Sequence, residues 1–274
     1  NAIKSKIFKT TPTSIEFIEG MRSPIRLGSE VFNEGKLSQE KLDQVISTIK
    51  SYESIFQKNK IDRYEIVATS AFRDTSNSED ARRYVETAIN HPLRVISGLE
   101  EAQLIRFHPK SNTGKNKIFV DLGGGSTEFF LRDSKGIEIR SFQLGAVRNM
   151  LSKDKKEEWI RLEKWLETIK PRKKLIGIGG NIRSFLQAHG KKELSVKELN
   201  KKIKEFSKLS TQEKIFKYKF SPDRADVIDH ALHIFKFISE HLMVETITST
   251  RWGVSDSIGV KIFHEIYSNK INIT

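Results

Sequence analysis

The 274-residue sequence contains no cysteine, and this absence excludes disulfides, thiolate zinc sites and cysteine nucleophiles. It contains no run of 18 apolar residues, so we expect no membrane-spanning helix and no membrane partner. The opening stretch NAIKSKIFKT lacks the apolar core of a signal peptide. Together these absences favour a cytoplasmic protein.

Several catalytic motifs are also missing, among them G-x-S-x-G, G-x-x-x-x-G-K-[ST], G-x-G-x-x-G and H-E-x-x-H. His230 and His233 lie three residues apart on one predicted helix, a spacing that indicates structural histidines rather than a metal site. We find no internal repeat at a fixed period.

The chain is strongly basic, with a formal net charge of +13 and a pI near 9.7. Such a charge favours polyanionic partners such as condensed phosphates, an anionic membrane or nucleic acid. The alternative is that the lysines only solubilise the protein, since runs such as KKELSVKELNKKIKEFSK mix both signs at helical spacing. No basic stripe is interleaved with aromatic residues, so nucleic acid is not favoured.

Strands and helices are predicted to alternate, which indicates an α/β protein. The predicted strands span residues 14–19, 65–68, 93–96, 117–121, 127–132, 137–142, 174–178 and 245–249. The predicted helices span residues 38–56, 78–89, 156–169 and 221–242, and further helices begin near residues 97 and 181. The polar stretch HPKSNTGKNK (108–117) is the best linker candidate. We therefore expect two domains, over residues 1–117 and 118–274.

Two glycine-rich turns are candidate phosphate loops. In IFVDLGGGSTEFF, Asp121 closes a strand and is followed by Gly123, Gly124, Gly125 and Ser126. Successive glycine amides can form a concavity that accepts phosphate oxygens, and an acid at the strand end can hold a hydrated magnesium ion. The alternative is a loose hairpin.

The second turn, LIGIGGNIRSFL, places Gly179, Gly180 and Asn181 between a strand and a helix start. A helix N-terminus reached through a glycine turn is a common anion site. Close packing between the strand and the helix is the alternative explanation.

Charged residues follow two of the predicted strands. In VISGLEEAQLI, Ser97 and Glu100 form a capping box, which leaves Glu101 free to orient a water for attack on phosphorus. The alternative is that both acids only favour the helix dipole. In VATSAFRDTSN, Arg73 could bind phosphate oxygens through its guanidinium group, or it could form a surface ion pair with Asp74 or Glu79.

Read together, these stretches resemble the exopolyphosphatase/guanosine pentaphosphate phosphohydrolase (Ppx/GppA) family, in its short form. The matching segments occur in order from residue 25 to about residue 260: IRLGSEVFNEGKLSQE, VATSAFRDTSN, VISGLEEAQLI, FVDLGGGSTEFF, FQLGAVR, GIGGN, DRADVI and STRWGVSDSIG. Each is weak alone, whereas their collinearity is specific.

The resemblance implies an actin-like fold of the sugar-kinase/heat-shock type, with two α/β domains around a cleft and the final helix packing back on the first domain. It implies a catalytic role for Glu101 and phosphate binding by both glycine turns, Arg73 and Asn1. It also implies that Mg²⁺ or another divalent cation binds near Asp121 and Glu128.

The sequence departs from the family pattern in three places. The family opens with a strand ending in D-x-G-S-N, and Asn1 matches only the last residue of that motif, so the first strand is either truncated here or lost. Asn181 stands where the family has threonine. Ser255, Asp256 and Ser257 stand where the family has arginine, glutamate and glycine, which removes a cation from the expected site.

We therefore expect a phosphoanhydride hydrolase that releases phosphate from inorganic polyphosphate, guanosine pentaphosphate or both. The first alternative is a catalytically weak sensor of polyphosphate or of the alarmone. A kinase of the same fold and a nucleic-acid-binding protein are the others. The resemblance leaves a homodimer open.

Overall fold

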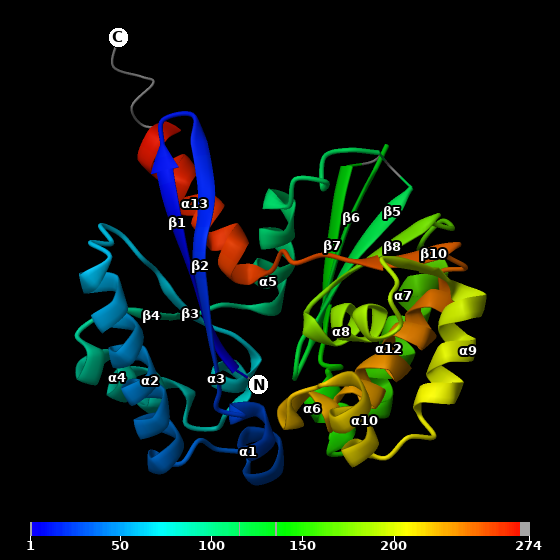
Figure 1. Ribbon diagram of the computed structural model, residues 1–274, viewed down its shortest axis with the longest axis horizontal. Coiled ribbons are helices and arrows are strands. Elements are labelled where there is room, and N and C mark those ends of the chain that lie inside the picture. Colours follow the sequence, from blue (N-terminus) through cyan, green and yellow to red (C-terminus); the bar gives the residue numbers. More distant parts are fainter. Residues whose placement is uncertain (1, 115, 135, 269–274) are drawn as a thin grey trace.

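The computed structural model describes residues 2–114, 116–134 and 136–268. Its elements form two α/β halves that lie side by side, with α5 and α13 between them (Figure 1). The strands are β1 (Ala2–Thr11), β2 (Ser14–Pro24), β3 (Ile66–Ala68), β4 (Leu93–Val95), β5 (Lys117–Leu122), β6 (Thr127–Asp133), β7 (Gly136–Phe142), β8 (Lys174–Ile178), β9 (Glu193–Ser195) and β10 (Thr246–Ser249).

The helices of the first half are α1 (Leu27–Glu34), α2 (Gln39–Lys58), α3 (Ser70–Asp74), α4 (Ser78–Ile89) and α5 (Gly98–Leu104), which continues into the 3-10 turn η1 (Ile105–Phe107). The helices of the second half are α6 (Ala146–Met150), α7 (Lys156–Thr168), α8 (Gly180–Ala188), α9 (Val196–Phe206), α10 (Thr211–Tyr218), α11 (Pro222–Ala225), α12 (Ile228–His241) and α13 (Val254–Ser268). None of these helices is long and apolar enough to cross a membrane.

Most periodic segments of the sequence form the elements that they predict, but the helix predicted over 221–242 is divided into α11 and α12. The helix predicted over 38–56 is α2, and the hydroxyl of Ser38 caps it by accepting a hydrogen bond from the amide of Lys41. Most of its predicted apolar stripe is buried, while Phe56 at the end of the stripe is half-buried. The strand predicted over 14–19 is longer than expected, because β2 pairs with β1 along its whole length in one antiparallel hairpin.

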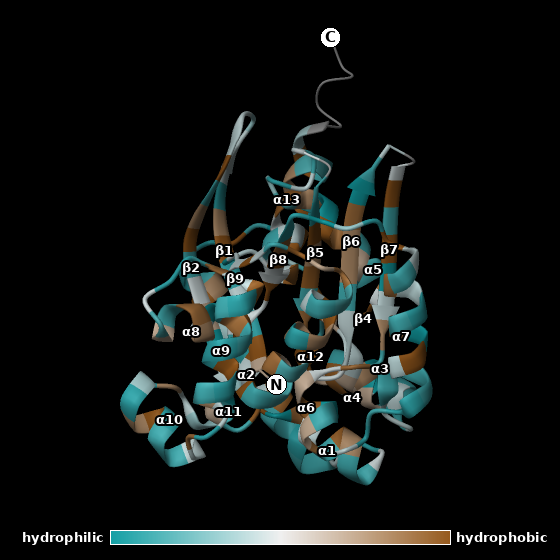
Figure 2. Ribbon diagram, turned by 90° about the vertical axis from the view of Figure 1, so that its right-hand side faces the viewer, coloured by the Kyte–Doolittle hydropathy of each residue, from teal (hydrophilic) through white to brown (hydrophobic). Residues whose placement is uncertain are grey.

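The C-terminal half is built on one six-stranded sheet in the order β7-β6-β5-β8-β10-β9. Strands β5, β8 and β10 run parallel to one another, so their carboxyl ends meet at one edge. Ile118 and Val120 of β5 are fully buried in the core that contains α7 and α12. The hydrophobic colour concentrates on β5 and β6, whereas the outer helices α9 and α10 are largely hydrophilic (Figure 2).

The N-terminal half is arranged differently. Here β1 pairs with β2, and β3 pairs in parallel with β4, so the strands form two separate two-stranded sheets. Helices α2 and α4 pack against each other beside them. The last helix, α13, returns from the second half and packs on β1, η1 and α5.

The face of the sheet that α5 covers carries its side chains in three rows, because cross-strand partners in a sheet point to the same side. We name them the polar row, the apolar row and the arginine row. The polar row is Asp121, Glu128 and Ser141, the apolar row is Phe119, Phe130 and Ile139, and the arginine row is Arg132 and Ile137. Helix α5 lies against β6 and β7, and Ile105 of η1 packs on the apolar row.

Candidate active site

Glu101 lies at the junction between α5 and the polar row. The residue lines a narrow crevice together with Asp121, Trp252 and Gly253. It is only 9% exposed, and its Oε2 is buried without a hydrogen-bond partner among the described residues. A buried acceptor without a partner costs about 1–3 kcal/mol, so this oxygen is suited to a group that the chain itself does not supply.

The position of Glu101 is fixed by the start of α5. The hydroxyl of Ser97 accepts from the amide of Glu100 at 3.1 Å, and Oε2 of Glu100 accepts from the amide of Ser97 at 2.8 Å. The predicted capping box is therefore confirmed. Gly98 lies so close to β7 that a Cβ there would stand 2.1 Å from Oγ of Ser141. These contacts seat α5 directly on the sheet.

The first glycine turn follows β5 and is shaped by α6. The carbonyl of Gly123 accepts from the amide of Ala146 at 3.0 Å, and that of Gly124 accepts from the amide of Val147 at 2.8 Å. Among the described residues, no acceptor is bonded to the amides of Gly124 and Gly125. The turn therefore directs its carbonyls toward α6 and leaves two N–H groups for an anion.

The glycine at 125 also has a packing reason. A Cβ there would stand 2.4 Å from the ring of Phe32 and 2.7 Å from Oγ of Ser70, both in the N-terminal half. The turn is the loop of the β5–β6 hairpin, as the alternative expects, but it is not loose, because it is held on one side by α6 and closely approached on the other by α1 and α3.

The second glycine turn lies next to the first because β5 and β8 are parallel neighbours. Gly179 has a φ of 105°, and a Cβ there would stand 3.1 Å from the carbonyl of Leu122. A Cβ on Gly180 would stand 2.3 Å from the guanidinium of Arg224, whose Nη1 donates to Oδ1 of Asn181 at 2.8 Å. The predicted residues Gly179, Gly180 and Asn181 are thus brought beside Asp121.

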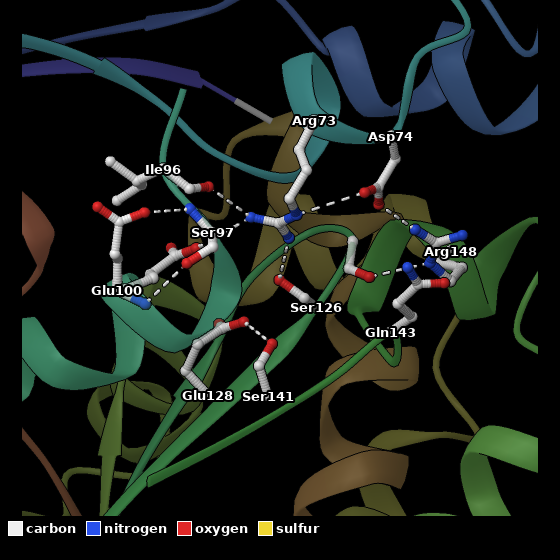
Figure 3. A network of polar contacts seen from close by, with 12 residues as sticks. Arg73, Asp74, Ile96, Ser97, Glu100, Ser126, Glu128, Ser141, Gln143 and Arg148 are labelled. Atoms are coloured by element: carbon white, nitrogen blue, oxygen red, sulfur yellow. Dashed lines mark hydrogen bonds and ion pairs between the residues drawn. The ribbon is translucent and has the colours of Figure 1, made fainter. Parts of the chain in front are cut away.

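Arg73, on α3, links the predicted residues of both halves (Figure 3). Its Nη1 donates to the carbonyl of Ile96 at 3.0 Å and lies 4.0 Å from Oε2 of Glu101. Its Nη2 donates to Oγ of Ser126 in the first glycine turn at 3.3 Å. It also pairs with Asp74, with Nε 3.4 Å from Oδ1. An ion pair with Asp74 is the alternative role that the sequence allows for Arg73, and the structure shows it together with the contacts to Glu101 and Ser126.

Three acids of the site have raised pKa values. Burial, and then the charge of Asp121, raises the pKa of Glu101 to about 8, against the opposing charges of Arg73 and Lys4. Burial raises the pKa of Asp121 to about 6, and Lys4 opposes that shift. Burial, followed by the charges of Glu101 and Asp121, raises the pKa of Glu128 well above its ordinary value. Such a cluster of shifted acids beside phosphate-loop geometry indicates a functional site.

Asp121 is the acid best placed to meet a metal ion. It is partly exposed, and among the described residues no donor is bonded to its carboxylate. Glu128 is 1% exposed and already accepts from Oγ of Ser141 at 2.9 Å, so it fits that role less well. No three His, Cys, Asp or Glu side chains of the described part of the chain are grouped to hold a metal. Magnesium commonly needs only one or two carboxylates, with water and substrate oxygens completing its shell.

Four cations that the sequence analysis did not assign border the same space. They are Lys4 on β1, Arg22 on β2, Arg183 on α8 and Arg224 on α11. Burial lowers the pKa of Lys4 and that of Arg224. The charges of Arg22 and Arg183 add to both shifts, and the charge of Arg224 adds to that of Lys4. The groups packed around Lys4 lower its pKa by desolvation, and the charge of Asp121 opposes that shift. Arg224 lies in the quoted motif DRADVI and Arg183 in the second glycine turn's stretch LIGIGGNIRSFL, whereas no motif signalled Lys4 or Arg22.

The departures near the C-terminus have structural roles. Asp256 accepts from Nζ of Lys6 and from the amide of Gly253, so it ties the start of α13 to β1. Ser257 accepts from Nε1 of Trp252 at 2.9 Å and so orients the ring that lines the crevice. The remaining predicted site residue, Asn1, lies outside the described residues.

Comparison with known proteins agrees with this geometry. A model of the Ppx/GppA phosphatase family matches residues 6–265. Over 251 residues the chain is 28% identical to a bifunctional 3-dehydroquinate synthase/phosphatase of Fusobacterium nucleatum, a match that covers 79% of this chain and 38% of that protein. The chain thus spans well under half the length of this curated relative.

Two solved structures show the likeness of fold. An exopolyphosphatase from Cytophaga hutchinsonii superposes with a TM-score of 0.84 at 20% identity, over 95% of this chain and 94% of that one. The Ppx/GppA enzyme of Aquifex aeolicus superposes with a TM-score of 0.75 at 22% identity, over 95% and 96%. The molecule has the two-domain, actin-like α/β fold that the resemblance implies.

Proposed function

Because the chain belongs to the Ppx/GppA phosphatase family, we propose that it hydrolyses terminal phosphoanhydride bonds, with inorganic polyphosphate, guanosine pentaphosphate or both as substrate. The observation that carries this proposal is the buried Oε2 of Glu101, which has no hydrogen-bond partner among the described residues and belongs to a residue that lines a narrow crevice with Asp121. A carboxylate in that position can accept a proton from an attacking water.

In the proposed reaction, a water held by Glu101 attacks the terminal phosphorus. The water's proton passes to Oε2 as the new P–O bond forms, and the bond from phosphorus to the bridging oxygen breaks, with its electron pair leaving on the shortened chain. The free amides of Gly124 and Gly125 stabilise the equatorial oxygens, and Arg73 lies between Glu101 and Ser126 on the same side. Positioning and preset charge supply most of the rate enhancement in such transfers.

Asp121 would hold a magnesium ion, and when bound that ion supplies charge neutralisation for the leaving phosphate. The second glycine turn, with Asn181 oriented by Arg224, lies at the same edge and would contact the leaving group. Lys4, Arg22, Arg183 and Arg224 extend the positive potential beyond the crevice. Together with the net charge of +13, this supports a substrate with many phosphates.

The direct test replaces Glu101 by glutamine. Glu101→Gln keeps the shape of the side chain and removes the base, so the turnover number should fall by about 10²–10⁴-fold while polyphosphate binding is retained. Phosphate release should be measured from polyphosphate and from guanosine pentaphosphate side by side, with and without magnesium. An unchanged turnover number would remove Glu101 from the role.

Glu100→Gln is the matched control. Glu100 precedes Glu101 and accepts from the amide of Ser97, and glutamine can replace glutamate in a capping box. We expect this variant to keep its turnover number within about twofold. Loss of activity in both variants would point to a disturbed α5 rather than to a missing base.

The alternative of a catalytically weak sensor is favoured by one observation. With a pKa of about 8, Glu101 is largely protonated at neutral pH and cannot then act as a base. Phosphate release that rises with pH up to about 8 and levels off above it would support the hydrolase. Binding of labelled polyphosphate in magnesium without release at any pH between 6 and 9 would support the sensor.

A further inference from the structure

A second cavity, of about 390 Å³, opens on the same face of the sheet as the candidate active site but at its other end. Its walls come from η1 and the segment after it, from the arginine row, and from α13. A volume of this size lies within the range of about 300–1,000 Å³ that is common for small-molecule sites. Nothing in the proposed hydrolysis uses it.

The cavity is basic. Arg106 and Arg132 both line it, and Nε of Arg132 is buried without a hydrogen-bond partner among the described residues. A buried guanidinium N–H without an acceptor is unusual in a folded protein and indicates a missing partner. An anion with oxygens in one plane is the partner that a guanidinium binds best.

The cavity also has an apolar and aromatic side. The rings of Phe107 and His264 lie nearly parallel, with centroids 6.1 Å apart, and the guanidinium of Arg106 lies 4.8 Å from the Phe107 ring centroid. Ile137, the cross-strand partner of Arg132, lines the cavity and is 50% exposed. An exposed apolar side chain beside an aromatic pair can hold the flat face of a ring.

His108 does not add a charge to this wall. The amide of Lys110 donates to its Nδ1 at 3.0 Å, so the proton is on Nε2, which donates to Oγ1 of Thr250 at 3.1 Å. Burial, followed by the charges of Lys110 and Lys117, lowers its pKa to about 4. Among the residues that line the cavity, the two arginines are therefore the permanently charged groups.

The cavity is separate from the candidate active site. Arg132 lies two rows from Glu128 along β6, which places it about 13 Å away along the strand. The apolar row and Ile105 fill the space between them. A ligand in the cavity would therefore contact the far end of the helical segment that carries Glu101 without touching the acids.

We propose that this cavity is a second binding site, for a nucleoside phosphate whose phosphate is bound by Arg132 and Arg106 and whose base lies against Phe107 and His264. The site does not depend on the proposed hydrolysis.

Isothermal titration calorimetry of the full chain with ADP in magnesium tests the proposal. ADP should bind, and adenosine and inorganic phosphate should each bind at least about tenfold more weakly, because each lacks one half of the recognised chemistry. Arg132→Met should weaken ADP binding by at least about tenfold. Arg140→Met is the matched control: Arg140 is on β7, 46% exposed and paired with Glu138 outside the cavity, and its loss should leave binding unchanged.

His264→Ala, at an exposed position, should also weaken ADP binding, and it keeps the test decisive if Arg132→Met fails to fold. Arg224→Met, in the candidate active site, should leave ADP binding intact. The proposal is overturned if millimolar ADP does not bind, if inorganic phosphate binds as tightly as ADP, or if Arg224→Met weakens binding while Arg132→Met and His264→Ala do not.

Discussion

The N-terminal half consists of two small sheets flanked by helices, whereas the C-terminal half is organised on one continuous sheet whose central strands are largely buried. The two halves also contribute different groups to the site. The C-terminal half contributes two backbone turns fixed at the ends of β5 and β8, and the N-terminal half contributes long charged side chains such as Arg73 and Lys4.

This division has a physical sense. Backbone amides can be held precisely only where the strands that carry them are rigid, which the six-stranded sheet provides. Charged side chains can reach the site from less regular elements. Helix α5 is the exception, since it precedes β5 in the chain but lies against β6 and β7. The helix that carries Glu101 therefore packs on the same sheet that carries the two glycine turns.

The largest effect is expected from breaking the ion pair that joins the halves. Arg148, on α6, pairs with Asp74 at 2.5 Å and lies over the ring of Phe32 at 4.2 Å, and both partners are in the N-terminal half. Arg148→Met would leave the carboxylate of Asp74 largely buried with only Arg73 beside it. The free energy of unfolding should fall by about 3 kcal/mol, measured by chemical denaturation.

Arg161 offers a control with the same kind of contacts inside one half. It pairs with Glu158 at 2.7 Å and lies over the ring of Phe142 at 4.2 Å, both in the C-terminal half, and it is 49% exposed. Arg161→Met should cost less than about 1 kcal/mol. Equal losses in the two variants would show that the contact between the halves contributes nothing special to stability.

The next effect is a pH dependence that tests whether acids from both halves lie together. The pKa of Glu101 is about 8 in the folded chain, above its ordinary value, so the folded state binds a proton that the unfolded state releases. The stabilisation is fully present below the unfolded-state pKa and is lost as the pH rises through about 8. The slope is at most about 1.4 kcal/mol per pH unit.

Chemical denaturation of the metal-free protein at pH 5, 6.5 and 8.5 measures this dependence. Glu101→Gln has no such proton to lose, so its stability should fall less than that of the wild type over the same interval. Asp121 and Glu128 contribute in the same direction in both proteins. Identical pH profiles for the two proteins would mean that Glu101 does not share a buried site with Asp121.

The smallest effect on stability is expected from removing one of two similar helix caps. Ser97 caps α5 and Ser210 caps α10, each in a complete capping box. Replacing either serine by alanine should cost about 1 kcal/mol of stability. Only Ser97→Ala should also lower the turnover number, by about tenfold, because small displacements of a catalytic group are costly. A loss of activity in Ser210→Ala would contradict this assignment.

The sequence predicted the parts of this molecule that depend on local pattern. Alternating and helical periodicity located β5, β6, β7 and α2, and the S-x-x-E spacing predicted the cap of α5. The order of the strands and their glycine turns indicated a phosphate site, and parallel pairing of β5 with β8 explains why the turns meet.

The remaining features depend on contacts between distant segments. Lys4 and Arg22 reach the site from a hairpin whose length no local signal fixed, and Arg183 lies on an ordinary helix. The close approach of Gly125 to Phe32 and Ser70 depends on how the halves pack, so glycine at 125 has a structural reason that its motif did not reveal. The cavity at the arginine row likewise joins η1, β6, β7 and α13.

The close packing at Gly98 has a consequence for how the candidate active site could open. At this point the helix backbone touches β7 so closely that no side chain, not even a methyl group, can be inserted without displacing Ser141. We therefore expect the helix and the sheet to move together, which would keep the spacing between the Glu101 carboxylate and the two glycine turns constant. Any opening of the site would then require movement of the β1–β2 hairpin, which carries Lys4 and Arg22.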